Sequence, residues 1–503
     1  MIGHTITVTV NGQPRIAQAG QRLSEILELD TPCGGHGSCG KCKVIATGTV
    51  SALDETEYTR LSQEERTRGV RLACRARAMG ACEITLLSSS EPMQIVTHSA
   101  DSLLSLEPTF SSFGVALDVG TTTLAARLYD TAGTLLGETA RTNPQAQWGA
   151  DVINRIEAAL GGHARALTDA IRTAIGEMLE ALACSAHISP NRIDGVVITG
   201  NTVMLSLLAG EDVEPFSHAP FAIARRFGET LTANALGLSL LSPATPVYLP
   251  PCISAFVGAD TVCALLATGA WEQERAMLAD VGTNGEMALC HQGKLTVCST
   301  AAGPAFEGVG ISMGMRGALG AIDRVDVVNG SLHAHVIGEV PPRGICGSGL
   351  VDAVACMLDL EILDDSGYLE DDHFPLSGKV TLTAEDVRML QLAKSAICAG
   401  LLTLLSHAQT TPSAFYLAGG FGNYLNRRNA AKIGLLPRSL ANIATPVGNA
   451  ALQGAALLLL DRKTRTQAQT VVENATVIDL AQNAVFSDRF MMGMALEEIC
   501  EPR

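Results

Sequence analysis

Four cysteines near the start of the chain have the residue type and spacing of a metal or iron–sulfur ligand set. Cys33, Cys39 and Cys42 form the pattern C-x5-C-x2-C, and Cys74 follows after 31 further residues. Thiolates are the ligands that iron–sulfur clusters require. The alternative is a structural zinc site, which usually uses two C-x2-C pairs, whereas this segment contains one. The pattern therefore favours a cluster held by four thiolates.

The residues around these cysteines predict the small module that would position them. Residues 6–10 alternate in polarity like a strand, residues 15–19 follow as its return strand, and residues 21–29 carry apolar side chains at helical spacing. The cysteine loop contains several residues that permit positive φ, namely Gly34, Gly35, Gly37 and Gly40. A hairpin, a helix and a glycine-rich ligand loop in this order resemble the β-grasp [2Fe–2S] ferredoxins over about residues 1–88.

This resemblance implies a [2Fe–2S] cluster bound by the same four cysteines, although the plant-type pattern has one residue fewer in its first gap. His36 lies inside the loop and could suggest a Rieske-type ligand. Because four cysteines already complete the coordination, we expect the His36 side chain to face solvent.

A second chemical pattern is an Asp-Val-Gly-Thr turn that occurs twice, 162 residues apart, within residues 113–130 and 276–295. Each copy follows an apolar strand. Such a turn offers backbone amides and hydroxyls to phosphate oxygens, and Asp118 and Asp280 at the strand ends can hold hydrated magnesium. The expected phosphate contacts are Gly120, Thr121, Thr122, Thr123, Gly282, Thr283 and Asn284. One such turn alone would be weak support, since Asp-Gly turns are common.

A third glycine turn follows an apolar strand in residues 415–425, where Gly419, Gly420 and Phe421 are expected near a nucleoside. The three motifs together resemble the phosphate-1, phosphate-2 and adenosine motifs of the acetate and sugar kinase, heat-shock-70 and actin (ASKHA, RNase H-like) superfamily. The resemblance implies a duplicated α/β ATPase domain with ATP between its halves. The sequence has no G-x4-G-K-[ST] motif, so amides and metal must meet most of the phosphate charge. The alternative is a pair of ordinary α/β turns.

Two further candidate positions have competing interpretations. Asp260, in the stretch VGAD, could orient an attacking water or could cap a helix N-terminus. Gly347 and Ser348, in GICGSGL, could contact ribose or phosphate, or could form a glycine turn between packed elements.

Composition narrows the class of protein. A length of 503 residues predicts about three folded units. Residues 1–90 carry 10 Lys/Arg against 9 Asp/Glu, so the total charge of −16 leaves −17 on the remainder, which disfavours a nucleic-acid partner. The sequence has no apolar run of 18 residues and no signal-peptide pattern, so we expect no membrane association and a cytoplasmic location.

The predicted organisation has four segments. A ferredoxin-like β-grasp domain (α+β) covers residues 1–88, a Ser-rich connector covers 89–111, and the two ATPase subdomains cover 112–275 and 276–503. The connector could let the first module move or could be a fixed strap. Among the other cysteines, four lie in apolar helical stretches and are expected to be buried: Cys184, Cys263, Cys356 and Cys398. We assign no ligand role to Cys290, Cys298 and Cys346.

A ferredoxin module followed by this ATPase fold resembles the reductive activators of corrinoid proteins. The match continues along nearly the whole chain, through NPQAQWGADVINRI, GNTVM, PCISAFVGAD, STAAGPAFEG, GICGSGL, VGNAALQGA and VFSDRFMMGMAL. The main departure is the short connector, because some members have an additional linker and a small middle domain there. Any role of that domain in forming a homodimer is therefore not transferred to this chain.

The resemblance implies an ATP-hydrolysing enzyme that passes one electron from its cluster to the inactive Co(II) state of a methyltransferase corrinoid protein and restores Co(I). It implies a [2Fe–2S] cluster, ATP and Mg²⁺ as cofactors, an upstream low-potential electron donor and a homodimer as one oligomeric state. Two alternatives stay open. One is ATP-gated electron donation to another acceptor, and the other is a redox-sensing, nucleotide-binding regulator that needs no sustained turnover. A small-molecule kinase would leave the ferredoxin module without a role.

Overall fold

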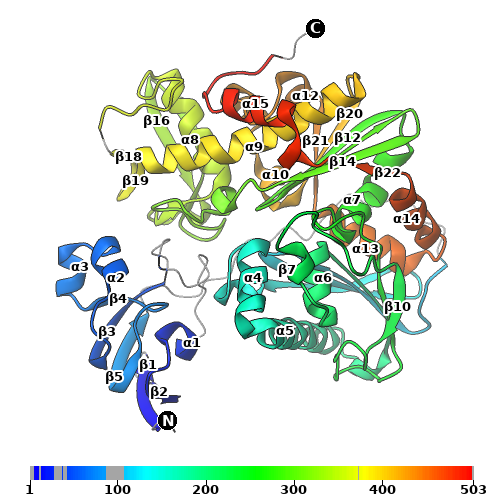
Figure 1. Ribbon diagram of the computed structural model, residues 1–503, viewed down its shortest axis with the longest axis horizontal. Coiled ribbons are helices and arrows are strands. Elements are labelled where there is room, and N and C mark those ends of the chain that lie inside the picture. Colours follow the sequence, from blue (N-terminus) through cyan, green and yellow to red (C-terminus); the bar gives the residue numbers. More distant parts are fainter. Residues whose placement is uncertain are drawn as a thin grey trace. The chain divides into compact units, whose positions relative to one another are not determined.

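The computed structural model describes residues 5–10, 13–27, 37, 42–86, 107–371 and 373–500 (Figure 1). Contacts divide the chain into two compact units. The first comprises residues 1–91 and 142–171, and the second comprises residues 92–141 and 172–503.

The first unit contains a five-stranded sheet in the order β2-β1-β5-β3-β4. Its strands are β1 (Thr5–Val10), β2 (Gln13–Gln18), β3 (Lys43–Val50), β4 (Val70–Leu72) and β5 (Ala78–Leu86). Three short helices accompany them: α1 (Leu23–Leu27), α2 (Glu55–Arg60) and α3 (Gln63–Thr67). β1 pairs parallel with β5 and antiparallel with β2, so the hairpin and helix predicted before the cysteine loop are present. Val8, Leu23, Val44, Leu72 and Ile84 are completely buried and form its core.

Residues 142–171 also belong to the first unit. They contain η1 (Pro144–Gln147), α4 (Val152–Ala158), η2 (Ala159–His163) and the first part of α5 (Ala164–Ser185). Arg155 is completely buried and donates to the Gly149 carbonyl at 3.0 Å and to Gln145 Oε1 at 3.1 Å. These contacts satisfy a buried cation with acceptors from its own segment.

The second unit contains two six-stranded sheets. The first has the order β10-β11-β9-β6-β7-β8 and consists of β6 (Phe113–Val119), β7 (Thr123–Asp130), β8 (Leu135–Thr142), β9 (Ile193–Gly200), β10 (Glu229–Thr232) and β11 (Pro246–Leu249). The second has the order β21-β20-β12-β13-β14-β22 and consists of β12 (Arg275–Val281), β13 (Gly285–His291), β14 (Lys294–Thr300), β20 (Ala414–Ala418), β21 (Ala444–Gly448) and β22 (Ala475–Val477).

Five strands of these two sheets share one topology, and the sixth strand, β10 or β22, lies at opposite edges. In each, an antiparallel hairpin (β6–β7 or β12–β13) begins the sheet, and its first strand pairs parallel with a later strand (β9 or β20) that pairs parallel with a further one (β11 or β21). The repeated topology confirms the duplicated α/β fold that the two Asp-Val-Gly-Thr turns predict.

Helices cover both sheets. They are α6 (Thr202–Ala209), α7 (Ala259–Thr268), α8 (Gly347–Asp359), α9 (Ala384–Ala408), α10 (Gly419–Tyr424), α11 (Arg427–Lys432), α12 (Arg438–Ile443), α13 (Ala450–Leu460), α14 (Thr464–Glu473) and α15 (Ala484–Met492). Two small sheets are added in the second half, namely β15 (Ala321–Val328), β16 (Ser331–Val336) and β17 (Gly344–Ile345), and β18 (His373–Ser377) with β19 (Val380–Thr383). α9, the long yellow helix in Figure 1, is apolar and long enough to cross a membrane, but 83% of its apolar window is buried inside the protein, as in a core helix.

The structure bears on two expectations from the sequence, the connector at residues 89–111 and the burial of four cysteines. Most of the connector lies outside the described residues, but its last part is fixed to the second unit, because the Thr109 amide donates to the Leu459 carbonyl at 3.0 Å.

Cys263, Cys356 and Cys398 are buried as expected, whereas Cys184 is exposed and its prediction was wrong. Cys184 lies near the end of α5, whose neighbouring Leu182 and Ala183 take the buried positions.

A buried lysine ties α9 to the C-terminal segment. The Lys394 side chain is fully buried in α9, and its Nζ donates to the Ala495 carbonyl. Burial lowers the pKa of Lys394 from 10.5 to about 8. Between these values the unfolded chain binds more protons at this site than the folded chain, so stability rises with pH in that interval.

We therefore expect the stability of the wild-type protein relative to Lys394→Met to increase between pH 8 and 10.5 by up to about 3 kcal/mol. Thermal unfolding of both proteins across this range measures the difference. Lys379→Met, at an exposed position, serves as control and should show no such trend. A wild-type-to-Lys394→Met difference that stays constant with pH would contradict the assignment.

Candidate functional site

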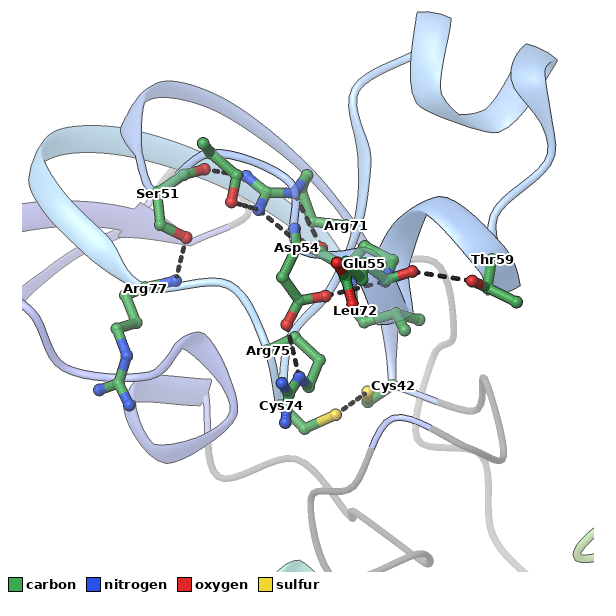
Figure 2. Close-up of polar contacts among 12 residues, drawn as sticks. Cys42, Ser51, Asp54, Glu55, Thr59, Arg71, Leu72, Cys74, Arg75 and Arg77 are labelled. Atoms are coloured by element: carbon green, nitrogen blue, oxygen red, sulfur yellow. Dashed lines mark hydrogen bonds and ion pairs between the residues drawn. The ribbon is translucent and has the colours of Figure 1, made fainter.

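Two of the four predicted cluster ligands lie side by side in the first unit. The Sγ atoms of Cys42 and Cys74 face each other at 3.2 Å, and both residues are buried (Figure 2). The Ala73 amide donates to the Cys42 carbonyl at 2.8 Å and so joins the two ligand segments. Two thiolates on one tetrahedral metal lie roughly 3.8 Å apart when metal–sulfur bonds are about 2.3 Å. The Cys42–Cys74 separation of 3.2 Å is shorter than this value, so the two thiols lie within reach of one metal ion but would move apart slightly to bind it.

The remaining predicted ligands, Cys33 and Cys39, lie outside the described residues, as does His36. Gly37, the one described glycine of the ligand loop, has φ +78°, which supports the argument that this loop needs glycine. A Cβ added to Gly37 would lie 2.7 Å from Thr56 Cγ2, so the loop also passes too close to α2 for a larger residue.

A buried ion pair fixes the strand that leads to Cys74. Arg71 on β4 bonds both carboxylate oxygens of Glu57, with Nε–Oε1 at 2.9 Å and Nη2–Oε2 at 2.7 Å. The side chains are 7% and 1% exposed. The guanidinium also donates to the carbonyls of Ser51 and Ala52, and the Leu72 amide donates to Glu57 Oε1. Because the charges are neutralised and bonded inside the module, this pair holds β4 rather than serving a ligand.

The second unit contains a cavity of ≈ 310 Å³ where the two Asp-Val-Gly-Thr hairpins meet. The predicted residues that line it are Asp118, Gly120, Thr121, Thr122, Thr123, Asp260, Asp280, Gly282, Thr283, Asn284, Gly347, Ser348, Gly419, Gly420 and Phe421. The structure therefore places all the residues proposed for nucleotide and magnesium around one space, although they come from five separate segments.

The two hairpin turns are similar but differ in length by one residue, because Val119 pairs with Leu124 in the first and Val281 pairs with Gly285 in the second. The Gly120 amide donates to the Thr123 carbonyl at 3.0 Å in the first, and the Gly282 amide donates to the Asn284 carbonyl at 3.0 Å in the second. Asp118 and Asp280 occupy corresponding positions at the ends of β6 and β12. Each turn thus brings hydroxyls and a carboxylate to the cavity, an arrangement suited to phosphates and a hard cation.

Two asparagines that the sequence reasoning did not single out hold the first hairpin. Asn201 and Asn449 are the N-cap residues of α6 and α13, and their Oδ1 atoms accept from helix amides at 2.9 and 2.8 Å. Their amide groups donate to the cavity side, from Asn201 to Thr121 Oγ1 and from Asn449 to Asp118 Oδ2, both at 3.0 Å. An aspartate or serine would cap the helix equally well but would lack this NH2 group. Asparagine directly after a buried strand, in GNTVM and VGNAAL, was the available sequence signal.

The aspartates in the cavity resist ionisation because they are removed from water. Burial raises the pKa of Asp118 to about 8, against the hydrogen bond from Asn449, and repulsion from Asp260 and Asp280 adds to the rise. Burial also raises the pKa of Asp260 to about 7 and that of Asp280 to about 6. A divalent cation in the cavity would reverse this effect, because it stabilises the charged carboxylates.

The second hairpin carries an additional acid that the first lacks. Glu286 on β13 lies directly opposite Asp280 in the strand pairing, so the two side chains share one face of the sheet. Burial, followed by repulsion from Asp260 and Asp280, raises the pKa of Glu286 well above its usual value. The corresponding partner of Asp118 in the first hairpin is Ala125. The duplicated halves are therefore chemically unequal, with more negative charge on the second.

The glycine turn that begins at Gly419 approaches Asp280 closely. Gly419 has φ +90°, and a Cβ there would lie 2.6 Å from Asp280 Oδ1. Only glycine fits without displacing the carboxylate. Phe421 stacks on Phe306, with ring centroids 4.4 Å apart and an interplanar angle of 22°. The pair gives the cavity an apolar aromatic wall beside the glycine turn.

The two positions with competing interpretations also face the cavity. Gly258, not Asp260, is the N-cap of α7, so the helix-cap alternative for Asp260 was wrong; Asp260 lies in the first turn, where its Oδ1 accepts from the Thr261 amide at 2.8 Å. Ser348 Oγ donates to the Asp323 carbonyl at 2.8 Å, which leaves the hydroxyl able to accept from a ligand. Ser348 therefore both joins α8 to β15 and lines the cavity.

Comparison with known proteins divides the chain into three matched regions. The chain matches sequence models of a 2Fe-2S iron–sulfur cluster binding domain over residues 2–79, the RACo middle region over 113–273, and the C-terminal, ASKHA domain of RACo over 274–500. It is 32% identical over 447 residues to the corrinoid activation enzyme RamQ of Eubacterium limosum, covering 82% of this chain and 75% of that protein.

Two further similar proteins are also described as a reductase or an activator for corrinoid proteins. The chain is 26% identical over 394 residues to the [Co(II) methylated amine-specific corrinoid protein] reductase of Methanosarcina barkeri, with 70% of each protein covered. A solved structure of a reductive activator for corrinoid, iron–sulfur protein is similar over 98% of both chains, at 27% identity and a TM-score of 0.72.

Removing the buried partner of Arg71 should loosen the cysteine module. We expect Glu57→Ala to destabilise it by about 3–5 kcal/mol, because a charge is left buried without its partner. In the full-length protein, the urea concentration at which the visible absorbance of the cluster disappears should fall by more than about 1 M. Glu55→Ala, on the exposed face of the same helix, is the matched control. Equal urea midpoints for the two variants would refute a bracing role for Glu57.

The amide of Asn449 should matter to the site more than to the fold. Asn449→Asp keeps the helix cap but replaces the donor to Asp118 with a second carboxylate, so we expect Mg-ATP binding to weaken by about tenfold or more. Titration with a fluorescent ATP analogue measures this. The control is Asn426→Asp, at another helix N-cap that does not line the cavity. If both variants bind Mg-ATP like the wild type, the Asn449–Asp118 contact has no part in the site.

Proposed function

The chain belongs to the family of reductive activators of corrinoid proteins, and we propose that it uses ATP to deliver a single low-potential electron to the inactive Co(II) state of a methyltransferase corrinoid protein, restoring Co(I). The observation that carries this proposal is the pairing, in one chain, of a cysteine-bearing ferredoxin module with a cavity built from both Asp-Val-Gly-Thr hairpins. The proposed parts are a ferredoxin domain (1–88), a connector (89–111) and ATPase subdomains (112–275 and 276–503).

Each module has a distinct chemical task. The match to a 2Fe-2S binding domain supports a [2Fe–2S] cluster, held in our proposal by Cys33, Cys39, Cys42 and Cys74, and this cluster would supply one electron per transfer. Its re-reduction needs an upstream low-potential donor. We place the protein in the cytoplasm, with a homodimer as its proposed assembly.

In the cavity, the hairpin turns would bind the phosphates through their amides and hydroxyls. Asp118 and Asp280 would hold the water ligands of Mg²⁺, and Asp260 would orient the attacking water. The Phe306–Phe421 wall and the Gly419 turn would receive the nucleoside. The raised pKa values of Asp118 and Asp260 support a cation at this position, because a metal ion would relieve the repulsion among the carboxylates.

ATP is needed because the electron transfer is uphill. Plant-type [2Fe–2S] centres have potentials near about −400 mV, and a Co(II)/Co(I) couple below that value loses a factor of ten in equilibrium for each ~59 mV. ATP can help only if it binds or is hydrolysed differently in two conformations of the complex. We infer that closure of the cavity around ATP alters the bound corrinoid partner, by removal of an axial cobalt ligand, and so raises the cobalt potential. Hydrolysis then resets the complex.

The experiment that tests this function mixes the pre-reduced protein with a Co(II) corrinoid protein under anaerobic conditions and follows Co(I) by its absorbance. Co(I) formation that requires Mg-ATP supports the proposal. Cluster oxidation without Co(I) would indicate a different acceptor, and binding without any electron transfer would indicate a redox-sensing regulator.

Within this reaction, Asp280→Asn should reduce the rate of Mg-ATP-dependent Co(I) formation by at least about tenfold, because the variant lacks a charge that positions the metal. Its cluster absorbance should stay unchanged. Asp326→Asn, a surface change on β15 outside the cavity, is the control. Unchanged Co(I) formation by Asp280→Asn would remove Asp280 from the proposed metal site.

A further inference from the structure

The cavity is strongly unbalanced in charge. Among the described residues that line it, six are carboxylates, and Arg316 is the one basic side chain. A nucleotide brings further negative charge in its phosphates. Magnesium and backbone amides meet part of that charge, and a guanidinium can meet more through paired hydrogen bonds to phosphate oxygens. Arg316 is therefore the side chain whose chemistry differs most from its surroundings.

Hydrogen bonds before and after Arg316 in the sequence fix the loop that carries it. Before it, the Ser312 amide and hydroxyl both donate to Asp386, each at 2.6 Å, and the Met315 amide donates to the Ile345 carbonyl at 2.9 Å. After it, the Gly320 amide donates to the Ile337 carbonyl at 3.0 Å. The loop thus has fixed ends, and the position of the arginine is set by the fold.

Arg316 lines the cavity together with Glu307, which contacts the second Asp-Val-Gly-Thr turn. Its charge lowers the pKa of Glu307, which burial otherwise raises to about 7. Glu307 Oε1 accepts from Thr283 Oγ1, in the second Asp-Val-Gly-Thr turn, at 3.0 Å. Glu307 Oε2 is buried and has no hydrogen-bond partner. Glu307 therefore joins its own segment to the second Asp-Val-Gly-Thr turn, and Arg316 lines the same cavity as both.

We propose that Arg316 is the cationic contact for the terminal phosphates of the nucleotide, at the cavity that the second Asp-Val-Gly-Thr turn also lines. This inference rests on the proposed nucleotide-binding function and adds a residue that distinguishes nucleotides by phosphate number. A purely structural role for Arg316, as the neutralising partner of Glu307, predicts no such discrimination.

The test compares binding of Mg-ATP and of AMP to the full-length protein, using fluorescent analogues of both nucleotides. Arg316→Ala should weaken ATP binding by about 10- to 100-fold, the range for loss of charge-assisted hydrogen bonds, and AMP binding by less than about threefold. Arg316→Lys keeps the charge but loses the planar fork, so its ATP affinity should fall between those of the wild type and Arg316→Ala. Arg343→Ala, in the same half but outside the cavity, should bind both nucleotides like the wild type.

The outcomes separate this inference from the proposed function. If the wild type binds Mg-ATP and Arg316→Ala keeps the wild-type ratio of ATP to AMP affinity, the role of Arg316 is overturned while the function stands. An equal weakening of ATP and AMP binding, with an unchanged circular dichroism spectrum, would also overturn it. If the wild type itself does not bind Mg-ATP, both the proposed function and this inference fail.

Discussion

A cluster of buried carboxyl groups in one cavity is the constraint on which the second unit depends. Asp118, Asp260, Asp280 and Glu286 come from four different elements, and burial raises the pKa of each. Such an arrangement is costly without a ligand, since the carboxylates repel one another and have lost water. In the proposed function, a divalent cation in the cavity would offset this cost, because it would stabilise the charged carboxylates.

The first unit also buries a carboxylate, but there an arginine neutralises its charge. Its buried Glu57 is neutralised by Arg71, which also satisfies two backbone carbonyls, so no charge is left for a ligand. The result is a rigid support for β4 and Cys74, whose position next to Cys42 must not change during electron transfer. The neutralised pair therefore keeps the first unit fixed. The buried acids of the second unit make it sensitive to a bound ligand.

Local patterns allowed much of this to be predicted. The alternation in residues 6–10, the repeated Asp-Val-Gly-Thr turns and the glycine turn after residue 418 each depend on neighbours in sequence, and the corresponding strands and hairpins are present. The family resemblance was confirmed by the comparisons. Contacts between distant segments were not predicted. Asn449 lies 331 residues from Asp118, and nothing local to either residue indicates their hydrogen bond.

The same limit applies to Glu286, Glu307 and Arg316. Glu286 becomes informative only when the strand register places it opposite Asp280, and Arg316 only when its loop reaches the cavity. The error at Cys184 has a similar origin, because apolar composition marks a helix as packed without saying which face the packing uses.

In the proposed function, ATP bound in this cavity raises the cobalt potential of the corrinoid partner so that the cluster can reduce it. The most direct measurement is the midpoint potential of the partner's Co(II)/Co(I) couple, determined by spectroelectrochemistry alone, with the protein, and with the protein plus Mg-ATP. We expect the midpoint potential of the Co(II)/Co(I) couple to rise toward that of the cluster when the ATP-bound protein is present. An unchanged potential in a demonstrated complex would contradict it.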